Sequence, residues 1–301
     1  MCRGILICII VFSAFSQANE IVPSIDIVTI SNSLIYIRPD SRIGNPSTLI
    51  LTGKDGVLLV DPGIMETADL IETEIKKRGH QHADIVLTTH FHRDHTEALQ
   101  FFGNDALVIA PENQRKRIAG PDMLGKGSPM PDNGLVKLTY SDSLTFHFNN
   151  EIIQVFKTPL KNGHTDGDQF IYFKKHKVLS VGDYLFDKFP IIDYADGGGN
   201  IDGYFATIDW LLTSFPADTK IIAGHGPFKP EQMHIYTMSE FAEHTDLLKR
   251  SIQIIRGKMA LDRSLEQITT EGLPTEFSRL DQKPRYLSAE RWIKQVYQFY
   301  K

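Results

Sequence analysis

The sequence predicts an α/β layered fold, and three observations support this prediction. Short apolar strands alternate with amphipathic helices over the first half of the chain. Glycines stand where the expected strands turn and where the expected helices end. The composition is that of a soluble globular protein, with 42% hydrophobic and 23% charged residues in a chain of 301. This composition argues against a disordered chain, a collagen-like repeat and a protein with several membrane spans.

The first half of the chain is expected to form hairpins and then strand–helix–strand units. Within residues 25–61, turns at Gly53 and Gly56 divide apolar runs at 34–37, 48–51 and 57–60. The units that follow are a helix over 67–78, a strand at 85–87, a helix over 96–102 and a strand at 107–109. Residues 113–134 then predict a helix that leads into a long loop.

The second half is expected to add more strands and then helices. Strands are predicted at 144–148, 152–156, 169–173 and 178–181, followed by a helix over 201–215 and a strand at 220–223. From about residue 230 the chain reads as mostly helical, with helices over 233–259, 264–269 and 290–300. No repeat or clear linker divides residues 19–301, so we expect one domain with a helical C-terminal segment.

The first eighteen residues predict a secretory signal peptide. Arg3 supplies positive charge, residues 5–12 are an unbroken apolar run, and Ser16 and Ala18 place small residues before the expected cleavage site. The alternative is an uncleaved anchor, but the run is shorter than the ~20 apolar residues of a membrane span. We therefore expect export, to the periplasm, and no stable membrane insertion of the mature chain.

Charge and cysteine content limit the partners and the chemistry. Lys and Arg number 32 and Asp and Glu number 37, a net charge of −5 without a basic run, so the chain is not expected to bind nucleic acid. The two cysteines, Cys2 and Cys8, both lie in the signal segment. Any metal site of the mature chain must therefore be built from His, Asp and Glu.

One loop concentrates candidate metal ligands between the strand at 85–87 and the next helix. In extended chain, alternate side chains share a face, so His90, His92 and Asp94 can point one way while His95 is one step out of phase. Imidazole and carboxylate groups are ligands that suit Zn²⁺. The loop can thus serve two neighbouring metal ions.

Three more candidate ligands follow apolar strands later in the chain. They are His164 after Gly163, Asp183 after Gly182, and His225 between two glycines. Loops beyond the strand ends of an α/β sheet converge on one edge, where sites assemble. We therefore expect these residues to join the histidine loop.

In this order and spacing, the ligand residues resemble those of the metallo-β-lactamase superfamily. The strand and turn ending in Asp61-Pro62-Gly63 are similar to an early motif of that family, and the resemblance runs from about residue 25 to residue 228. It implies a four-layer αββα sandwich, two mixed β-sheets packed face to face with helices outside. It implies two metal ions, the first held by His90, His92 and His164, the second by Asp94, His95 and His225, with Asp183 bridging both.

The sequence departs from the best-known antibiotic-destroying members of that family. Some of those use a cysteine at the second metal, which the mature chain lacks, and others lack the bridging aspartate found here as Asp183. The ligand set is more similar to that of the glyoxalase-II, lactonase and arylsulfatase-type hydrolases. The family name is therefore not a prediction of the substrate.

The predicted centre suits hydrolysis. Two metal ions about 3.5–4 Å apart can share a hydroxide that attacks a carbonyl carbon. Asp94 is a candidate acceptor for its proton, and Tyr184 is a candidate oxyanion donor, although packing is its favoured role. Asp61 can orient a ligating histidine or simply form a turn. Asp166 and Asp168 can support His164 or form a tight acidic turn, which is the favoured interpretation.

Two loops are candidates for the pocket wall. Residues 186–200 carry Phe189, Tyr194 and a run of three glycines directly after Asp183, and the loop around 123–130 is the second candidate. The remaining histidines lack motif context and are interpreted as surface or packing residues: His80, His82, His147, His176, His234 and His244.

These observations predict a secreted dinuclear zinc hydrolase. Its metal-bridging hydroxide would cleave a small-molecule ester, lactone, thioester or β-lactam, and the sequence does not choose among these. Iron or manganese in place of zinc also fits the ligands. Two other functions stay open, namely a dinuclear iron oxidoreductase of the persulfide-dioxygenase kind and a non-catalytic periplasmic metal-binding protein.

Overall fold

Two β-sheets form the centre of the molecule. This computed structural model describes residues 23–40, 46–226, 234–281 and 288–301, so the predicted signal peptide lies outside the described residues. The first sheet has seven strands in chain order: β1 (Ser24–Thr29), β2 (Leu34–Asp40), β3 (Thr48–Gly53), β4 (Gly56–Val60), β5 (Ile85–Leu87), β6 (Leu107–Pro111) and β7 (Leu138–Tyr140). It is antiparallel from β1 to β4 and parallel from β4 to β7.

The second sheet has six strands and runs in the reverse chain order. Its members, across the sheet, are β13 (Tyr236–Thr237), β12 (Lys220–Ile222), β11 (Val178–Ser180), β10 (Phe170–Phe173), β9 (Glu151–Phe156) and β8 (Ser143–Phe148). Only the β11–β12 pair among these is parallel. Both sheets are therefore mixed, as the family resemblance implied.

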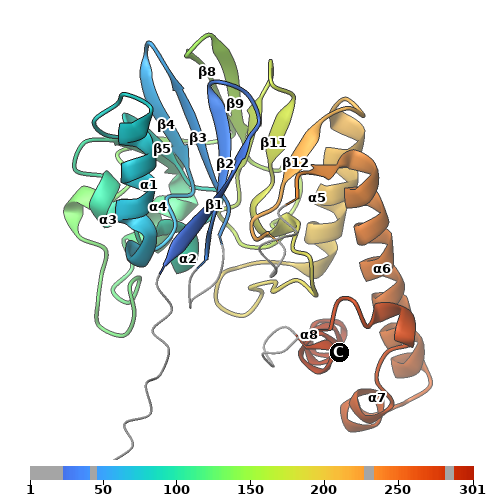
Figure 1. Cartoon of the computed structure of the whole chain (residues 1–301). Coiled ribbons are helices and arrows are strands. Elements are labelled where there is room, and N and C mark those ends of the chain that lie inside the picture. The colour runs from blue at the N-terminus through green and yellow to red at the C-terminus, as the bar shows by residue number, and fades with distance from the viewer. Residues whose placement is uncertain (1–22, 41–45, 227–233, 282–287) are drawn as a thin grey trace, which may run out of the picture.

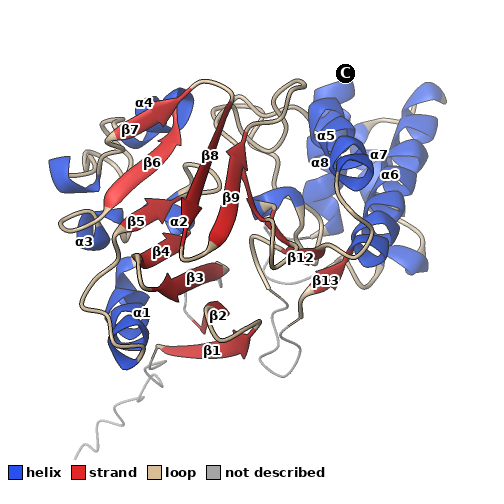
Figure 2. Ribbon diagram, turned by 90° about the horizontal axis from the view of Figure 1, so that it is seen from above, coloured by secondary structure: helices blue, strands red, loops and turns tan. Residues whose placement is uncertain are grey.

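Helices cover the outer face of each sheet (Figures 1 and 2). The first sheet carries α1 (Met65–Lys77), α2 (Arg93–Thr96), α3 (Leu99–Phe102) and α4 (Glu112–Ile118). On the outer side of the second sheet lie α5 (Ile201–Ser214) and α6 (Met238–Ala260), while α7 (Leu265–Glu271) and α8 (Ala289–Tyr300) pack beside α6 below the strands of Figure 1. This arrangement confirms the predicted αββα sandwich.

Three apolar clusters hold the four layers together. The middle cluster joins the facing sides of the two sheets, for example Leu58 and Val60 with Val155 and Phe173. The other two clusters lie under the outer helices, one beneath α1 and one beneath α5, α6 and α8. The burial of apolar surface on both faces of each sheet explains why many of the strands read as continuous apolar runs.

The structure corrects two predicted helices. The helix expected over 96–102 is interrupted, because the amide of Ala98 donates to the carbonyl of Gly63 outside the helix at 2.9 Å. The helix expected from 233 begins at Met238, where Thr237 and Glu240 form a capping box. Tyr236 and Thr237 instead pair with β12 as strand β13. The sequence did not predict β1 and β7 as separate strands.

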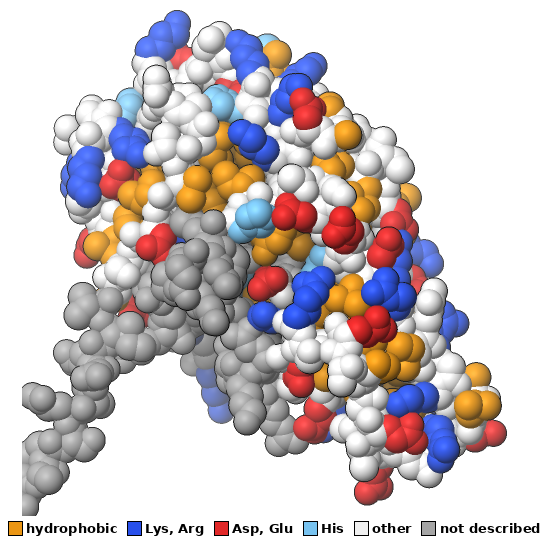
Figure 3. All heavy atoms as spheres, turned by 45° about the vertical axis from the view of Figure 1, so that its right-hand side comes forward, with side chains coloured by type: hydrophobic (Ala, Val, Ile, Leu, Met, Phe, Trp, Pro, Cys, Tyr) orange, Lys and Arg blue, Asp and Glu red, His pale blue; other side chains and the backbone are white. Residues whose placement is uncertain are grey.

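Charged side chains of both signs lie on the molecular surface. On the face shown in Figure 3, which turns the C-terminal helices forward, acidic and basic side chains are interspersed over the described residues. Among the helices of the described part of the chain, none combines the length and the apolar character that a membrane crossing requires.

Candidate metal centre

Four loops that follow strands β5, β9, β11 and β12 place the predicted ligands. The loop after β5 is held by two buried glutamines. The side chain of Gln114 donates to the carbonyls of Thr88 and Thr89, and the backbone amide of Gln169 donates to the carbonyl of Thr89 at 2.8 Å. Because Gln114 also donates to the carbonyl of Gly167, it ties this loop to the one that carries His164.

Close approach of backbone to side chains requires glycine beside two of the ligands. A Cβ atom at Gly163 would lie 1.8 Å from the hydroxyl of Tyr184, and one at Gly224 would lie 2.1 Å from Oδ1 of Asp183. His225 itself is held by single β-bridges to Pro46 and Phe186, both outside the named strands. Gly163 and Gly224 are therefore required by packing, because a larger residue would collide with Tyr184 or Asp183.

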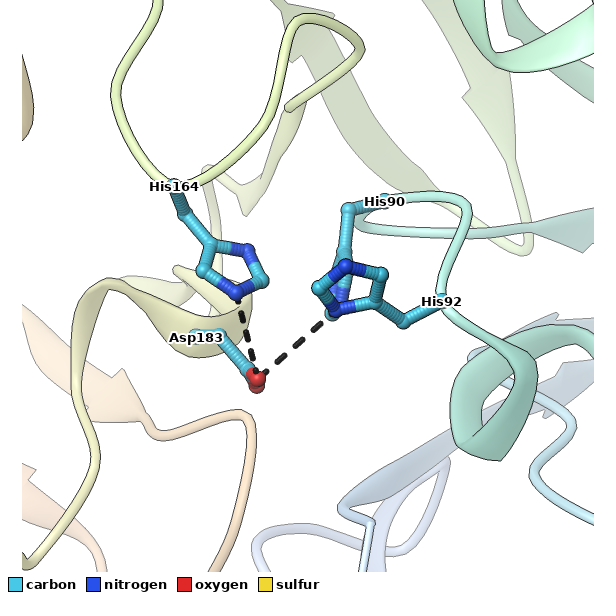
Figure 4. A group of neighbouring side chains, drawn as sticks. All are labelled: His90, His92, His164 and Asp183. Atoms are coloured by element: carbon cyan, nitrogen blue, oxygen red, sulfur yellow. Dashed lines mark ion pairs between the residues drawn. The ribbon is translucent and has the colours of Figure 1, made fainter. Parts of the chain in front are cut away.

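The predicted ligands converge into two adjoining groups. One holds His90, His92, His164 and Asp183, and the other holds Asp94, His95 and His225; within each group the potential ligand atoms lie within 4.8 Å of one another. Figure 4 shows the first group, with His90 and His92 coming from one loop, His164 from another, and Asp183 from the short helical turn Gly182–Tyr184. All seven residues were predicted from the sequence, and the structure brings all seven together.

Asp183 lies between the two groups, with one carboxylate oxygen toward each. Its Oδ2 lies 3.8 Å from Nε2 of His90 and 3.6 Å from Nε2 of His164. Its Oδ1 lies 3.3 Å from Nε2 of His95 and 3.5 Å from Nε2 of His225. In the second group, Asp94 Oδ2 lies 3.2 Å from Nε2 of His225. This is the arrangement that a bridging carboxylate needs.

Several of the potential ligand atoms are placed to bind a metal ion and form no hydrogen bond with one another. Among the described residues, the buried atoms that have no hydrogen-bond partner include Nε2 of His90, Nε2 of His164 and Oδ1 of Asp183. Buried polar atoms are nearly always paired, so such orphans need an explanation. Ligands of a tetrahedral Zn²⁺ at about 2.1 Å lie roughly 3.4 Å apart, close to the separations given above. The residues present therefore fit two cations.

Burial and neighbouring charges shift the pKa values of the ligands in opposite directions. Burial and the adjacent His95 hold the pKa of His90 well below its ordinary value. Burial also disfavours charge on His225, but Asp183 and Asp94 outweigh it and raise the pKa of His225 to about 9. The pKa of Asp94 and that of Asp183 are both lowered despite burial, because His95 and His225 lie beside them.

Zinc binding should release protons at neutral pH. The raised pKa of His225 means that the metal-free chain holds a proton there below pH 9, and a metal ion must displace it. Metal affinity should therefore rise by about tenfold per pH unit for each displaced proton, until the pH passes 9. Calorimetric titration with zinc at pH 7.5, in buffers of different ionisation enthalpy, counts the released protons. A titration that releases none would contradict this assignment of charge.

Carboxylates outside the ligand set orient two of the imidazoles. Asp61 is buried and accepts hydrogen bonds from the amide and hydroxyl of Thr89 and from Nδ1 of His95 at 2.9 Å. Asp193 Oδ2 lies 3.1 Å from Nε2 of His92. A carboxylate can only accept, so each holds the ring proton on the bonded nitrogen and leaves the other nitrogen free for a metal. The orienting role was one of two interpretations of Asp61, whereas no motif in the sequence pointed to Asp193.

The acidic turn after His164 is mainly structural. Asp168 accepts from the amide and hydroxyl of Thr165, and its Oδ1 lies 3.7 Å from Nδ1 of His164, beyond hydrogen-bond range. Asp166 pairs with Arg117 at 2.6 Å. Both observations support the favoured interpretation of a tight acidic turn.

Tyr184 is buried and its hydroxyl is already engaged. The hydroxyl donates to Asp168 Oδ2 at 2.9 Å and accepts from the amide of His164, and the ring stacks on Tyr204. The geometry favours packing over oxyanion stabilisation.

The substitution Tyr184→Phe should therefore act on stability more than on turnover. Loss of the hydroxyl should cost about 1–2 kcal/mol of unfolding free energy, because two buried partners lose a hydrogen bond. Turnover should fall by less than about tenfold, whereas loss of an oxyanion donor costs about 10²–10³. Denaturant unfolding and steady-state kinetics of the metal-loaded variant measure both. A 100-fold fall in kcat with full metal content would restore the oxyanion role.

A pocket of about 590 Å³ opens beside the first group. Its lining includes Phe91, His92, Met123, Asp193 and Gly197, so both predicted wall loops contribute to it. Phe189, expected to face the pocket, is fully buried and stacks on Trp292 of α8 instead. This aromatic residue belongs to the C-terminal core because α8 covers the segment before Asp193.

Two adjoining groups of imidazole and carboxylate donors, at the strand ends of an αββα sandwich, define a metallo-hydrolase scaffold. The family model of the metallo-β-lactamase superfamily matches residues 42–225. The chain belongs to this superfamily.

Curated relatives and solved structures agree with this assignment. The chain is similar to a hydroxyacylglutathione hydrolase of Bartonella henselae, 26% identical over 64% of this chain and 68% of that protein. A hydroxyacylglutathione hydrolase of Mesorhizobium japonicum is 33% identical over 56% of this chain and 61% of that protein. A metallo-β-lactamase from Pontibacter korlensis shares the fold, with a TM-score of 0.59, 21% identity, and coverage of 75% of this chain and 99% of that one.

Proposed function

We propose that this protein is an exported dinuclear zinc hydrolase that cleaves a small uncharged ester or lactone. The observation that carries the hydrolase assignment is the position of Asp183, whose two oxygens face the two ligand groups. A single carboxylate shared in this way suits a pair of cations and has no evident role without them. Export rests on the signal-peptide features of residues 1–18.

Seven side chains would hold the two ions. His90, His92 and His164 would bind the first, Asp94, His95 and His225 would bind the second, and Asp183 would contact both. Two bound zinc ions would supply Lewis acidity toward the substrate carbonyl and would lower the pKa of a coordinated water from 15.7 to about 7. Asp94 is ionised at neutral pH, since its pKa is lowered, and its carboxylate is placed to accept a proton from the attacking water.

The pocket wall supports an uncharged substrate. Its two arginines are already neutralised within the chain, Arg93 by Glu97 at 2.5 Å and Arg117 by Asp166 at 2.6 Å. The pocket also carries three carboxylates, from Asp122, Asp193 and Asp196. Like charges repel, so a polyanionic substrate such as a glutathione thioester would be disfavoured. Phe91 and Met123 offer apolar contact to an acyl or aryl group.

A substrate panel tests the proposal. The purified zinc-loaded protein is assayed with an aryl ester, a lactone, a glutathione thioester and a chromogenic cephalosporin, each with and without chelator. The proposal expects chelator-sensitive turnover of the ester or lactone, with kcat/KM at least about tenfold above that for the thioester. A preference for the thioester or the cephalosporin would contradict the substrate class. A protein that carries two metal ions and hydrolyses none of the four would contradict the hydrolase assignment.

Export has its own test. Expression of the full chain in a Gram-negative host, followed by fractionation and mass measurement, should yield a periplasmic chain that begins at Asn19. A cytoplasmic chain that keeps residues 1–18 would contradict it.

A further inference from the structure

The loop that follows Asp183 reaches back to a ligand of the first group. Asp193 Oδ2 lies 3.1 Å from Nε2 of His92, and both side chains are about a quarter exposed, at 25% and 23%. His92 is the most exposed histidine of its group, because His90 and His164 are each 1% exposed. Packing holds the two buried rings in place, so His92 is the ring that most needs an outside partner.

The position of Asp193 is set by its own backbone. Its amide donates to the carbonyl of His164 at 3.0 Å, and its carbonyl accepts from the amide of Gly199 at 2.8 Å. A Cβ atom at Gly197 would lie 2.2 Å from Asp193 Oδ2, so only glycine there leaves room for the carboxylate. Asp193 is thus fixed to His164 through the backbone and to His92 through the side chain.

Helix α8 holds the segment from which Asp193 projects. Gln295 donates to the carbonyl of Ile192, and the guanidinium of Arg291 donates to the carbonyl of Pro190 at 3.1 Å. Just beyond Asp193, the hydroxyl of Tyr194 donates to Gln298 at 2.9 Å. Helix α8 therefore binds the backbone carbonyls that precede Asp193 and the side chain of Tyr194 that follows it. This helix lies about a hundred residues further along the sequence.

We propose that Asp193 is a positioning residue for the first metal ion, and that α8 sets its place. The carboxylate accepts the Nε2 proton of His92 and so presents Nδ1 of that ring to the metal. The C-terminal helix then controls affinity at the first group through Gln295, Ile192 and Asp193. This proposal rests on the proposed function only in that both require the two groups to bind metal.

Zinc affinity of the full chain tests the first step. Competition with a chromogenic chelator should show that Asp193→Ala weakens one of the two zinc ions by about 10- to 100-fold and leaves the other unchanged. Asp193→Asn, which keeps an oxygen acceptor, should recover part of that loss. Asp196→Ala is the matched control, because Asp196 lies in the same loop, and the same pocket, without contacting a ligand in the described structure; it should bind zinc as the unaltered chain does.

A double variant tests the second step. Gln295→Leu keeps the size of the side chain but removes the donor to Ile192, and it should weaken the same zinc ion by a smaller factor. Because the helix acts through Asp193, adding Gln295→Leu to Asp193→Ala should cause no further loss. The cobalt-substituted protein gives a second readout, since the visible spectrum of one of the two bound ions should change in Asp193→Ala and not in Asp196→Ala.

Several outcomes would overturn the proposal. Unchanged affinity for both zinc ions in Asp193→Ala would remove the positioning role, and equal losses in Asp193→Ala and Asp196→Ala would assign the effect to loop charge. If Gln295→Leu lowers zinc affinity by the same factor in the Asp193→Ala background as it does alone, α8 acts on the metal site independently of Asp193. If Asp193→Ala unfolds, the comparison passes to Asp193→Asn. An unaltered chain that binds two zinc ions but hydrolyses nothing would contradict the proposed function and leave this proposal standing.

Discussion

Replacing Asp183 by alanine should lower kcat/KM by about 1000-fold. For comparison, the loss of a single oxyanion-hole donor lowers turnover by about 10²–10³. The reason is that Asp183 faces both ligand groups, so its loss removes one donor from each. It also removes the negative charge that favours protonation of His95 and His225, whose Nε2 atoms lie 3.2 Å apart. The pKa of His225 should then fall from about 9 toward its ordinary value, and zinc binding at neutral pH should release fewer protons.

The isosteric variant Asp183→Asn separates these effects. An amide has one oxygen able to bind a metal and one nitrogen that is not, so this variant should keep one zinc ion and lose most affinity for the other. Metal analysis after dialysis, together with kcat/KM for the best substrate, measures the outcome. An Asp183→Asn protein that holds two zinc ions and keeps turnover within tenfold of the unaltered chain would show that the carboxylate does not bridge. Similar circular dichroism spectra for both variants serve as the folding control.

The ligand set was predictable because its geometry is local. His90, His92, Asp94 and His95 lie within six residues of one another, directly after β5. The expected extended alternation was wrong for Asp94, because α2 begins at Arg93 and its turn directs Asp94 toward His225 in the second group. His164, Asp183 and His225 each follow an apolar strand, and the topology of layered sheets brings such ends together. Most strand and helix positions were predictable for a related reason, since glycines and apolar runs mark the boundaries in the sequence itself.

The residues that support the ligands were harder to predict because their positions depend on packing far away in sequence. Asp193 has no motif around it. Backbone hydrogen bonds to His164 and Gly199, together with the contact of α8 with Ile192, place it beside His92. The break in the helix at Ala98 depends likewise on a hydrogen bond to Gly63, 35 residues earlier. Strand β13 forms where an amphipathic helix pattern continued, because Tyr236 finds a partner strand in β12. In each case a tertiary contact overrides the local pattern.

Replacing Asp61 by alanine should destabilise the protein by about 3–5 kcal/mol, because three buried donors lose their acceptor and each unpaired group costs about 1–3 kcal/mol. Those donors are the amide and hydroxyl of Thr89 and Nδ1 of His95. Asp61 also has a positive φ of 51°, a conformation that Asp tolerates better than Ala. Affinity for the second zinc ion should fall by about 10- to 100-fold as well, since His95 is no longer oriented.

The variant Asp61→Asn distinguishes stability from metal binding. An asparagine keeps the positive φ and an acceptor for Thr89, so most of the unfolding free energy should be retained. Its amide nitrogen, however, can donate to Nδ1 of His95, and this moves the ring proton to Nε2, the nitrogen that faces Asp183 and the second group. Asp61→Asn should therefore be folded yet bind the second zinc ion weakly, as measured by denaturant unfolding and chelator competition. If the variant is folded and binds both ions with unchanged affinity, Asp61 serves only as a turn, and the tautomer of His95 is set by other groups.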